Sequence, residues 1–108
     1  MSNLEFLHTE VFLASYSRLS ANNQKHITSA MRKLGANPHS PFPRGLKVHI
    51  LKGVKGTPLK KGGRKPPVWE LHAGGGKGGG DMLITFQYGE NSIILRNCGS
   101  HDVISKNP

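Results

Sequence analysis

Histidine is the residue type in this 108-residue sequence best suited to chemistry, and it occurs six times. Three of these residues, His49, His72 and His101, stand beside charged residues, on the polar side of predicted strands or directly after the last one. An imidazole has a reference pKa of about 6.5, so it can both remove and deliver a proton near neutral pH. These three are therefore candidates for general acid–base catalysis. The others are expected to be ordinary surface residues: His8, His26 and His39.

The pattern of possible metal ligands does not favour a metal centre. The single cysteine, Cys98, excludes a cysteine-based zinc site and an internal disulfide. The histidines stand singly rather than as a His-x-x-x-His pair, and the chain around them is cationic. The sequence therefore predicts neither a metal site nor a cofactor.

Cleavage of RNA without a metal needs chemistry that this set of residues can supply. The 2′-hydroxyl must lose a proton, the 5′-oxygen must gain one, and the negative charge on phosphorus must be stabilised. Histidine suits both proton transfers, and the planar guanidinium of arginine binds phosphate oxygens in pairs. One sheet face could thus carry an RNA-cleaving set formed by His49, His72, His101 and Arg96. Histidines that only bind or pack are the alternative.

Positive charge is concentrated in one part of the chain. There are 15 Lys and Arg against 6 Asp and Glu, a formal charge of +9, and no acidic residue lies between Glu10 and Glu70. Such a stretch is either a solvated basic face or a surface for a polyanion, which is a nucleic acid or an acidic protein. The candidate RNA- or phosphate-binding residues are Arg44, Lys47, Lys52, Lys55, Lys60, Lys61, Arg64, Lys65 and Lys77.

The length and the apolar pattern limit the kind of protein. A chain of 108 residues excludes a multidomain enzyme and a Rossmann-type cofactor protein. No apolar run approaches the roughly 18 residues of a membrane span, and the N-terminus has no signal-peptide pattern. We therefore expect a single domain over residues 1–108, located in the cytoplasm.

Apolar spacing in the first part of the chain predicts a short strand and two helices. The strand or extended lead-in covers residues 4–8, and a helix begins at Glu10. A second helix follows the capping residues at 20–23, and Gly35 is predicted at its C′ position. The short connection favours an antiparallel helix pair.

The rest of the chain alternates as strands do. Strands are predicted over residues 46–51, 68–72, 82–88 and 92–97, with a mobile basic insert at about 53–67 and a Gly-rich loop at 74–80. Residues 98–108 are predicted as a loop or short turn. The expected fold class is α+β, with an N-terminal antiparallel helix pair packed on a mostly antiparallel, twisted sheet of about four strands.

Four local patterns, in this order, resemble the RelE/ParE superfamily of type II toxin–antitoxin toxins, and especially its YafQ-like branch. Leu46–Gly53 resembles the family's His-x-Leu-x-Gly strand, and Val68–His72 resembles the strand after it. Asp81–Tyr88 is similar to the strand that opens with an acid. Ile94–Asp102 is similar to the closing segment, in which a histidine follows Gly-Ser. The resemblance implies the RelE-like fold.

The resemblance also implies a metal-independent endoribonuclease. Toxins of this branch cleave mRNA at the ribosomal A site and leave a 2′,3′-cyclic phosphate and a 5′-hydroxyl. Matched residue by residue, His72 and His101 with Asp81 would share the acid–base work, His49 would assist, and Arg96 would stabilise the phosphate. The implied partners are mRNA, ribosomal RNA and a cognate antitoxin, with which the chain would form a hetero-oligomer.

Two other functions are compatible with this sequence. A ParE-like DNA gyrase poison shares the fold, although not the histidine set, and a non-catalytic basic RNA-binding protein would explain the charge. The sequence also departs from the family pattern at two positions. Asn97 stands where the closing segment usually has its basic residue, which leaves Arg96 one residue further from His101, and Met82 replaces an aromatic residue.

Overall fold

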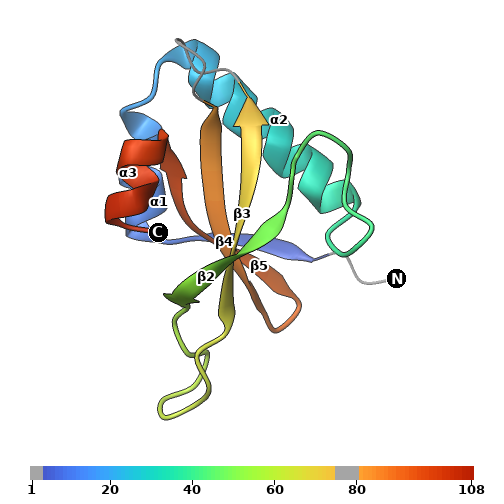
Figure 1. Cartoon of the computed structure of the whole chain (residues 1–108), viewed down its shortest axis with the longest axis vertical. Coiled ribbons are helices and arrows are strands. Elements are labelled where there is room, and N and C mark those ends of the chain that lie inside the picture. Colours follow the sequence, from blue (N-terminus) through green and yellow to red (C-terminus); the bar gives the residue numbers. More distant parts are fainter. Residues whose placement is uncertain (1–3, 75–80) are drawn as a thin grey trace.

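Five strands and three helices make up the described part of the chain, residues 4–74 and 81–108 of a computed structural model (Figure 1). The Gly-rich loop predicted at 74–80 lies outside the described residues except for Gly74, which ends a strand. In chain order the elements are β1 (Glu5–His8), α1 (Glu10–Ser17), α2 (Ala21–Ala36), β2 (His49–Lys55), β3 (Pro67–Gly74), β4 (Met82–Gly89), β5 (Ser92–Gly99) and α3 (His101–Lys106). The predicted α+β class is confirmed.

The sheet has the strand order β1-β5-β4-β3-β2. Strands β2 to β5 form the predicted antiparallel meander, and β1 joins β5 in parallel, with Phe6 opposite Ile93. The prediction of about four strands was therefore too low by one. The strand predicted at residues 4–8 is present as β1, but its parallel pairing with β5 depends on a long crossover and is not visible in the local sequence.

The hydrophobic core lies between one face of the sheet and the helices α1 and α2. Ile84, Phe86 and Leu95 point from the central strands towards Ile27 and Leu34 of α2, and all five are fully buried. Each such side chain contributes about 1.5–3 kcal/mol by leaving water. Since side chains alternate along a strand, the opposite face of β3 and β4 is left to carry polar groups.

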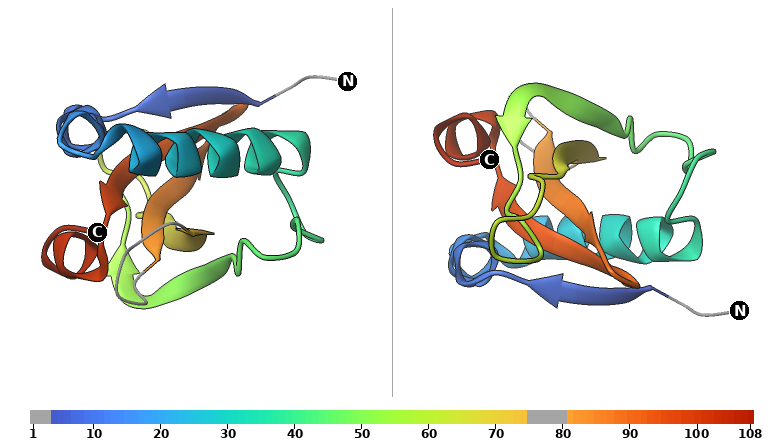
Figure 2. Two further views of the ribbon diagram at one scale, coloured as in Figure 1. Left: turned by 90° about the horizontal axis from the view of Figure 1, so that it is seen from above. Right: turned by 90° about the horizontal axis from the view of Figure 1, so that it is seen from below.

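The two N-terminal helices begin where the sequence predicts but do not form an antiparallel pair. Thr9 and Ser20 accept hydrogen bonds from the backbone N–H groups of Phe12 and Asn23 and so cap the helices. Figure 2 shows α1 end-on where α2 is seen along its length. The reason is that α1 packs along β5, whereas α2 lies across β3 and β4.

The end of α2 corrects a second prediction. Gly35 lies inside the helix, which continues to Ala36 and has Asn37 as its C-cap. A Cβ atom at Gly35 would lie 3.0 Å from the ring of Phe6 on β1. The glycine therefore serves the close packing of β1 on α2 rather than the end of the helix.

Two boundaries near the candidate site also differ from the prediction. β2 begins at His49 and runs through Lys55, so the start of the predicted insert is strand, and its last residue, Pro67, begins β3. The Gly56 N–H donates to the carbonyl of Pro66 (2.7 Å), which closes the segment between the two strands into a hairpin loop.

The C-terminal segment is a strand end and a helix rather than a loop. β5 runs to Gly99, Ser100 caps α3 by accepting from the Val103 N–H, and Ile104 is buried. The helix α3 lies on the side of the sheet opposite α1 (Figure 2). There Ile104 and Leu83 line the same cavity. None of the helices in the described ranges is long and apolar enough to cross a membrane.

Candidate active site

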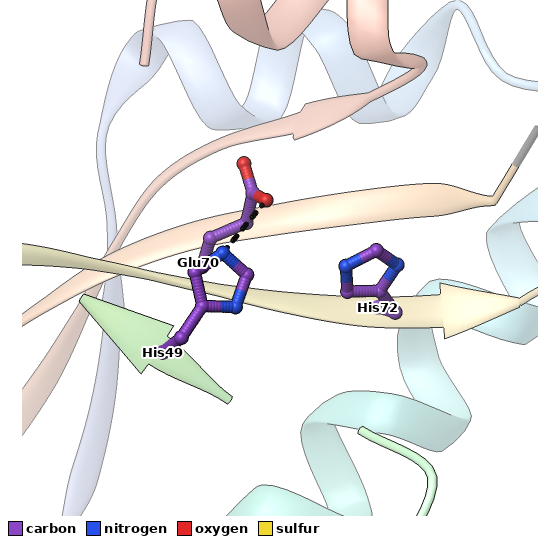
Figure 3. A group of neighbouring side chains, drawn as sticks. All are labelled: His49, Glu70 and His72. Carbon is purple, nitrogen blue, oxygen red and sulfur yellow. Dashed lines mark ion pairs between the residues drawn. The ribbon is translucent and has the colours of Figure 1, made fainter. Parts of the chain in front are cut away.

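Three of the polar side chains on the outer face of the sheet come from β2 and β3. His49 pairs across the strands with Glu70, and the alternation of β3 puts His72 on the same face as Glu70. His49 Nε2 lies 3.3 Å from a Glu70 carboxylate oxygen. The ring centroids of His49 and His72 are 6.0 Å apart (Figure 3). The predicted meander thus brings two of the predicted histidines together.

Asp81 and His101 complete the group around His72. The Asp81 carboxylate lies 3.1 Å from His72 Nδ1, and the rings of His72 and His101 are 6.2 Å apart in an edge-to-face arrangement. A carboxylate beside Nδ1 favours the tautomer in which Nδ1–H donates to it. The other ring nitrogen of His72, Nε2, then carries the lone pair that can accept a proton.

A tight backbone turn positions His49. Its Nδ1 lies 2.7 Å from the carbonyl oxygen of Lys47, and Lys47 adopts the left-handed backbone conformation (φ 52°). The preceding carbonyl, of Leu46, accepts the His72 backbone N–H at 2.6 Å. The segment that the sequence assigns to the start of a strand is therefore a turn held against β3. This backbone conformation is uncommon for a residue other than glycine.

A cavity of about 270 Å³ opens beside His72 and Asp81. Three basic side chains from two parts of the chain line it, namely Lys33 on α2 and Arg44 and Lys47 on the turn. Arg44 and Lys47 are predicted phosphate-binding residues, whereas Lys33 was missed. A lysine in the last turn of a helix is typical of a helix end and does not indicate a functional site. Lys33 lies near β3 only because of tertiary packing.

A second cavity, of about 220 Å³, lies on the other side of the histidine pair. His101 and Glu70 line it together with the apolar side chains of Leu51, Leu83 and Ile104. The pair His72 and His101 therefore stands where a basic cavity and a more apolar one meet. A phosphate beside the first and a sugar or base beside the second would be compatible with these linings.

The remaining predicted basic residues lie away from the first cavity. They are exposed, on β2 or on the hairpin loop after it: Lys52, Lys55, Lys60, Lys61, Arg64 and Lys65. Lys77 lies outside the described residues. Their predicted contacts with a polyanion stay a prediction.

Arg96 lies on the outer face of β5, at a β-bulge. Thr85 pairs with Asn97 while the next residue of β4, Phe86, pairs with Leu95, so Arg96 is the extra residue. The bulge places Arg96 and Asn97 on the same face, which compensates for the one-residue displacement seen in the sequence.

The partners of Arg96 differ from those of the histidines. Its Nη1 donates to Gln87 Oε1 (2.6 Å) and to Thr57 Oγ1 (3.0 Å), and its Nε donates to the Pro108 carbonyl (3.1 Å). Burial lowers the pKa of Arg96. Within residues 4–74 and 81–108, no hydrogen bond or ion pair joins it to a histidine. These contacts tie the hairpin loop, β4, β5 and the C-terminal residues together.

We predict that Arg96→Ala acts mainly on stability. Loss of its charged hydrogen bonds is expected to lower the free energy of unfolding by about 1.5–3 kcal/mol, measured by chemical denaturation. Arg64→Ala, which removes an exposed arginine of the loop, serves as the matched control and should stay within about 0.5 kcal/mol of the parent protein. A stable Arg96→Ala protein that no longer cleaved RNA would instead place Arg96 at the phosphate.

Two other residues near the site are unavailable for contact with a substrate. Met82 is buried, at 7% exposure, so it cannot stack on a base where the family has an aromatic residue. Burial raises the pKa of the Cys98 thiol to about 12, so the thiol stays protonated at neutral pH and is a poor nucleophile.

The comparisons with known proteins identify the fold. No protein-family model matches the sequence, and no curated protein is significantly similar to it. Among solved structures, the RelB–RelE antitoxin–toxin complex of Methanococcus jannaschii is similar, at TM-score 0.60 and 13% identity over 93% of this chain and 95% of that one. The DinJ–YafQ complex of Escherichia coli is similar at TM-score 0.54 and 17% identity, over 94% and 97%.

A metal-bound toxin from Helicobacter pylori is also similar, at TM-score 0.55 and 20% identity, over 92% of this chain and 96% of that one. Every one of these structures is a toxin or contains one. The chain therefore has the RelE-like toxin fold, as the resemblance in the sequence predicts.

Proposed function

We propose that this chain is the toxin of a type II toxin–antitoxin module and that it cleaves mRNA. The observation that carries the proposal is the pair of His72, bonded to Asp81, and His101 beside a cavity lined by cationic side chains. The RelE-like fold supports the toxin class. The histidine set favours a nuclease over a gyrase poison of the same fold.

The proposed reaction uses the two histidines for the two proton transfers. His72 Nε2 takes the proton of the 2′-hydroxyl, and the 2′-oxygen attacks the adjacent phosphorus. The 5′-oxygen leaves with a proton from His101, so the products are a 2′,3′-cyclic phosphate and a 5′-hydroxyl. Asp81 holds the tautomer of His72 and stabilises its protonated form.

The surrounding residues stabilise charge and position the substrate. Lys33, Arg44 and Lys47 line the cavity in which the scissile phosphate would lie, and they compensate the charge that builds up on its oxygens. His49 assists from the neighbouring strand, where Lys47 and Glu70 hold its ring. Arg96 is hydrogen-bonded to Gln87, Thr57 and Pro108, so its proposed role is to stabilise the sheet next to the site.

The proposed partners follow from the charge and the fold. The exposed basic residues of β2 and the hairpin loop suit ribosomal RNA, which would present the mRNA at the A site in the cytoplasm, or an acidic segment of an antitoxin. The antitoxin would form a hetero-oligomer with this chain and cover these exposed basic residues.

The test is whether this protein, added as the one toxin to a purified translation system, cleaves the mRNA during translation. We expect primer extension to show cuts at a fixed position within codons, with 2′,3′-cyclic phosphate ends. Expression in cells should stop growth unless the open reading frame beside the gene is co-expressed. Defects in DNA supercoiling would indicate the gyrase poison, and RNA binding without cuts would indicate a non-catalytic protein.

A further inference from the structure

Side chains that were expected to stand singly form a compact set of nitrogen and oxygen donors. One ligand atom each from His49, Glu70 and His72 lies within 4.8 Å of the other two. The sequence argues against a metal because its histidines are scattered, but strand pairing puts His49 opposite Glu70, and the two-residue alternation puts His72 beside it. The grouping therefore arises from the fold and not from a local motif.

In both histidines Nδ1 is hydrogen-bonded, which leaves Nε2 free to face the donor cluster. A carbonyl oxygen only accepts hydrogen bonds, so His49 Nδ1 must donate to the Lys47 carbonyl. His72 Nδ1 is hydrogen-bonded to the Asp81 carboxylate. Histidines that ligate metals generally have their other nitrogen bonded in this way to a carbonyl or a carboxylate. Figure 3 shows that the remaining nitrogen of His72 faces His49 and Glu70.

The carboxylate between them is well placed for a cation. The side chain of Glu70 is only 10% exposed, and its carboxylate lies 3.3 Å from His49 Nε2. If His49 is neutral, its Nε2 presents a lone pair to the carboxylate, which is repulsive. Either a proton or a metal ion between the two atoms removes that repulsion.

We propose that His49, Glu70 and His72 bind one divalent transition-metal ion of the zinc or copper type, and that this ion inhibits the chain. Two imidazoles and one carboxylate suit zinc, copper or nickel, whereas magnesium and calcium prefer sets made of oxygen only. The inhibitory part rests on the proposed function, because the ion takes the lone pair of His72 that would accept the 2′-hydroxyl proton.

Charge and geometry are consistent with such a site. The ligand carboxylate and the Asp81 carboxylate behind His72 together offset the two charges of the ion. A tetrahedral ion with bonds of about 2.1 Å needs donors roughly 3.4 Å apart, so the donors must close in slightly. His49 is 46% exposed and its ring has room for that adjustment.

The binding experiment uses the purified full chain and the metal ion alone. Titration with Co²⁺ is expected to give one equivalent with the visible absorption of a nitrogen- and oxygen-ligated ion. Zn²⁺ at a hundredfold excess over its Kd should raise Tm by about 10 °C. Glu70→Gln and His49→Ala should both lose these signals, while His39→Ala, which alters an exposed histidine elsewhere, should keep them.

Circular dichroism of each variant shows whether it is folded, and Glu70→Gln keeps the size of the side chain. Binding of no ion at one equivalent, or binding equally strong in the His49→Ala and Glu70→Gln proteins, would overturn the site.

The cleavage experiment separates the site from the function. One equivalent of Zn²⁺ should slow RNA cleavage at least tenfold, and EDTA should restore it. In His49→Ala the ratio of rates with and without Zn²⁺ should be close to one. Equal rates for the zinc-loaded and the EDTA-treated parent protein would overturn the inhibition. If RNA is not cut even with EDTA, the proposed function fails, while the Co²⁺ spectrum still decides the site.

Discussion

Alanine in place of His72 is expected to lower the rate of mRNA cleavage by about 10²- to 10⁴-fold, the usual contribution of a positioned acid or base. His101→Ala should have an effect of the same size, because each histidine carries one of the two proton transfers. Asp81→Asn should cost less, about 10- to 100-fold, since Asp81 acts through the orientation of His72. Single-turnover cleavage of a translated mRNA measures all three.

The controls for these variants must show that the fold survives. His72 is partly buried on the outer face of β3, and His101 is exposed at the start of α3. Neither is part of the hydrophobic core, so Tm should change little in either variant. His39→Ala removes an exposed histidine that stacks on Tyr88, away from the site, and should keep its activity. A His72→Ala or His101→Ala protein that still stopped growth would contradict the assignment.

Much of the sheet could be predicted because its signals are local. Alternation of apolar and polar residues predicts three of the four meander strands to within about two residues, and the same alternation places Glu70 and His72 on one face. The capping residues at 20–23 correctly predict the start of α2, whereas Ser100, which caps α3, lies in a segment predicted as a loop. Even so, the functional interest of Glu70 was missed, although an isolated acid two residues before a histidine was a usable signal.

Other features depend on contacts between distant parts of the chain. The bulge at Arg96 puts Arg96 and Asn97 on the same face of β5, and the sequence of β5 contains no signal that predicts it. Lys33 reaches the basic cavity because α2 crosses β3. β1 is placed by its pairing with the distant strand β5 and by the packing of Phe6 against Gly35. Spacing in the sequence cannot report such geometry, so the proximity of the histidines could be expected from the sequence while the side chains around them could not.

Removing the three cationic side chains of the basic cavity is expected to have the second largest effect. The triple variant Lys33→Ala, Arg44→Ala and Lys47→Ala removes the three side chains that are proposed to contact phosphates. Each contact contributes about 0.7 to the slope of log affinity against log salt for a single strand, so three lower the slope by about 2 and the affinity at 0.1 M salt by about 100-fold. Filter binding across a salt series measures both quantities.

The matched control removes the same charge from the hairpin loop, as Lys60→Ala, Lys61→Ala and Lys65→Ala. Both triple variants should bind RNA more weakly, because both surfaces are proposed to contact the polyanion. Only the cavity variant should also cleave at least tenfold more slowly at saturating RNA, because its side chains lie beside His72, where charge develops on the phosphate. Equal loss of cleavage in the two variants would mean that the cavity contributes only long-range attraction, and the scissile phosphate would then have to be placed elsewhere on the outer face.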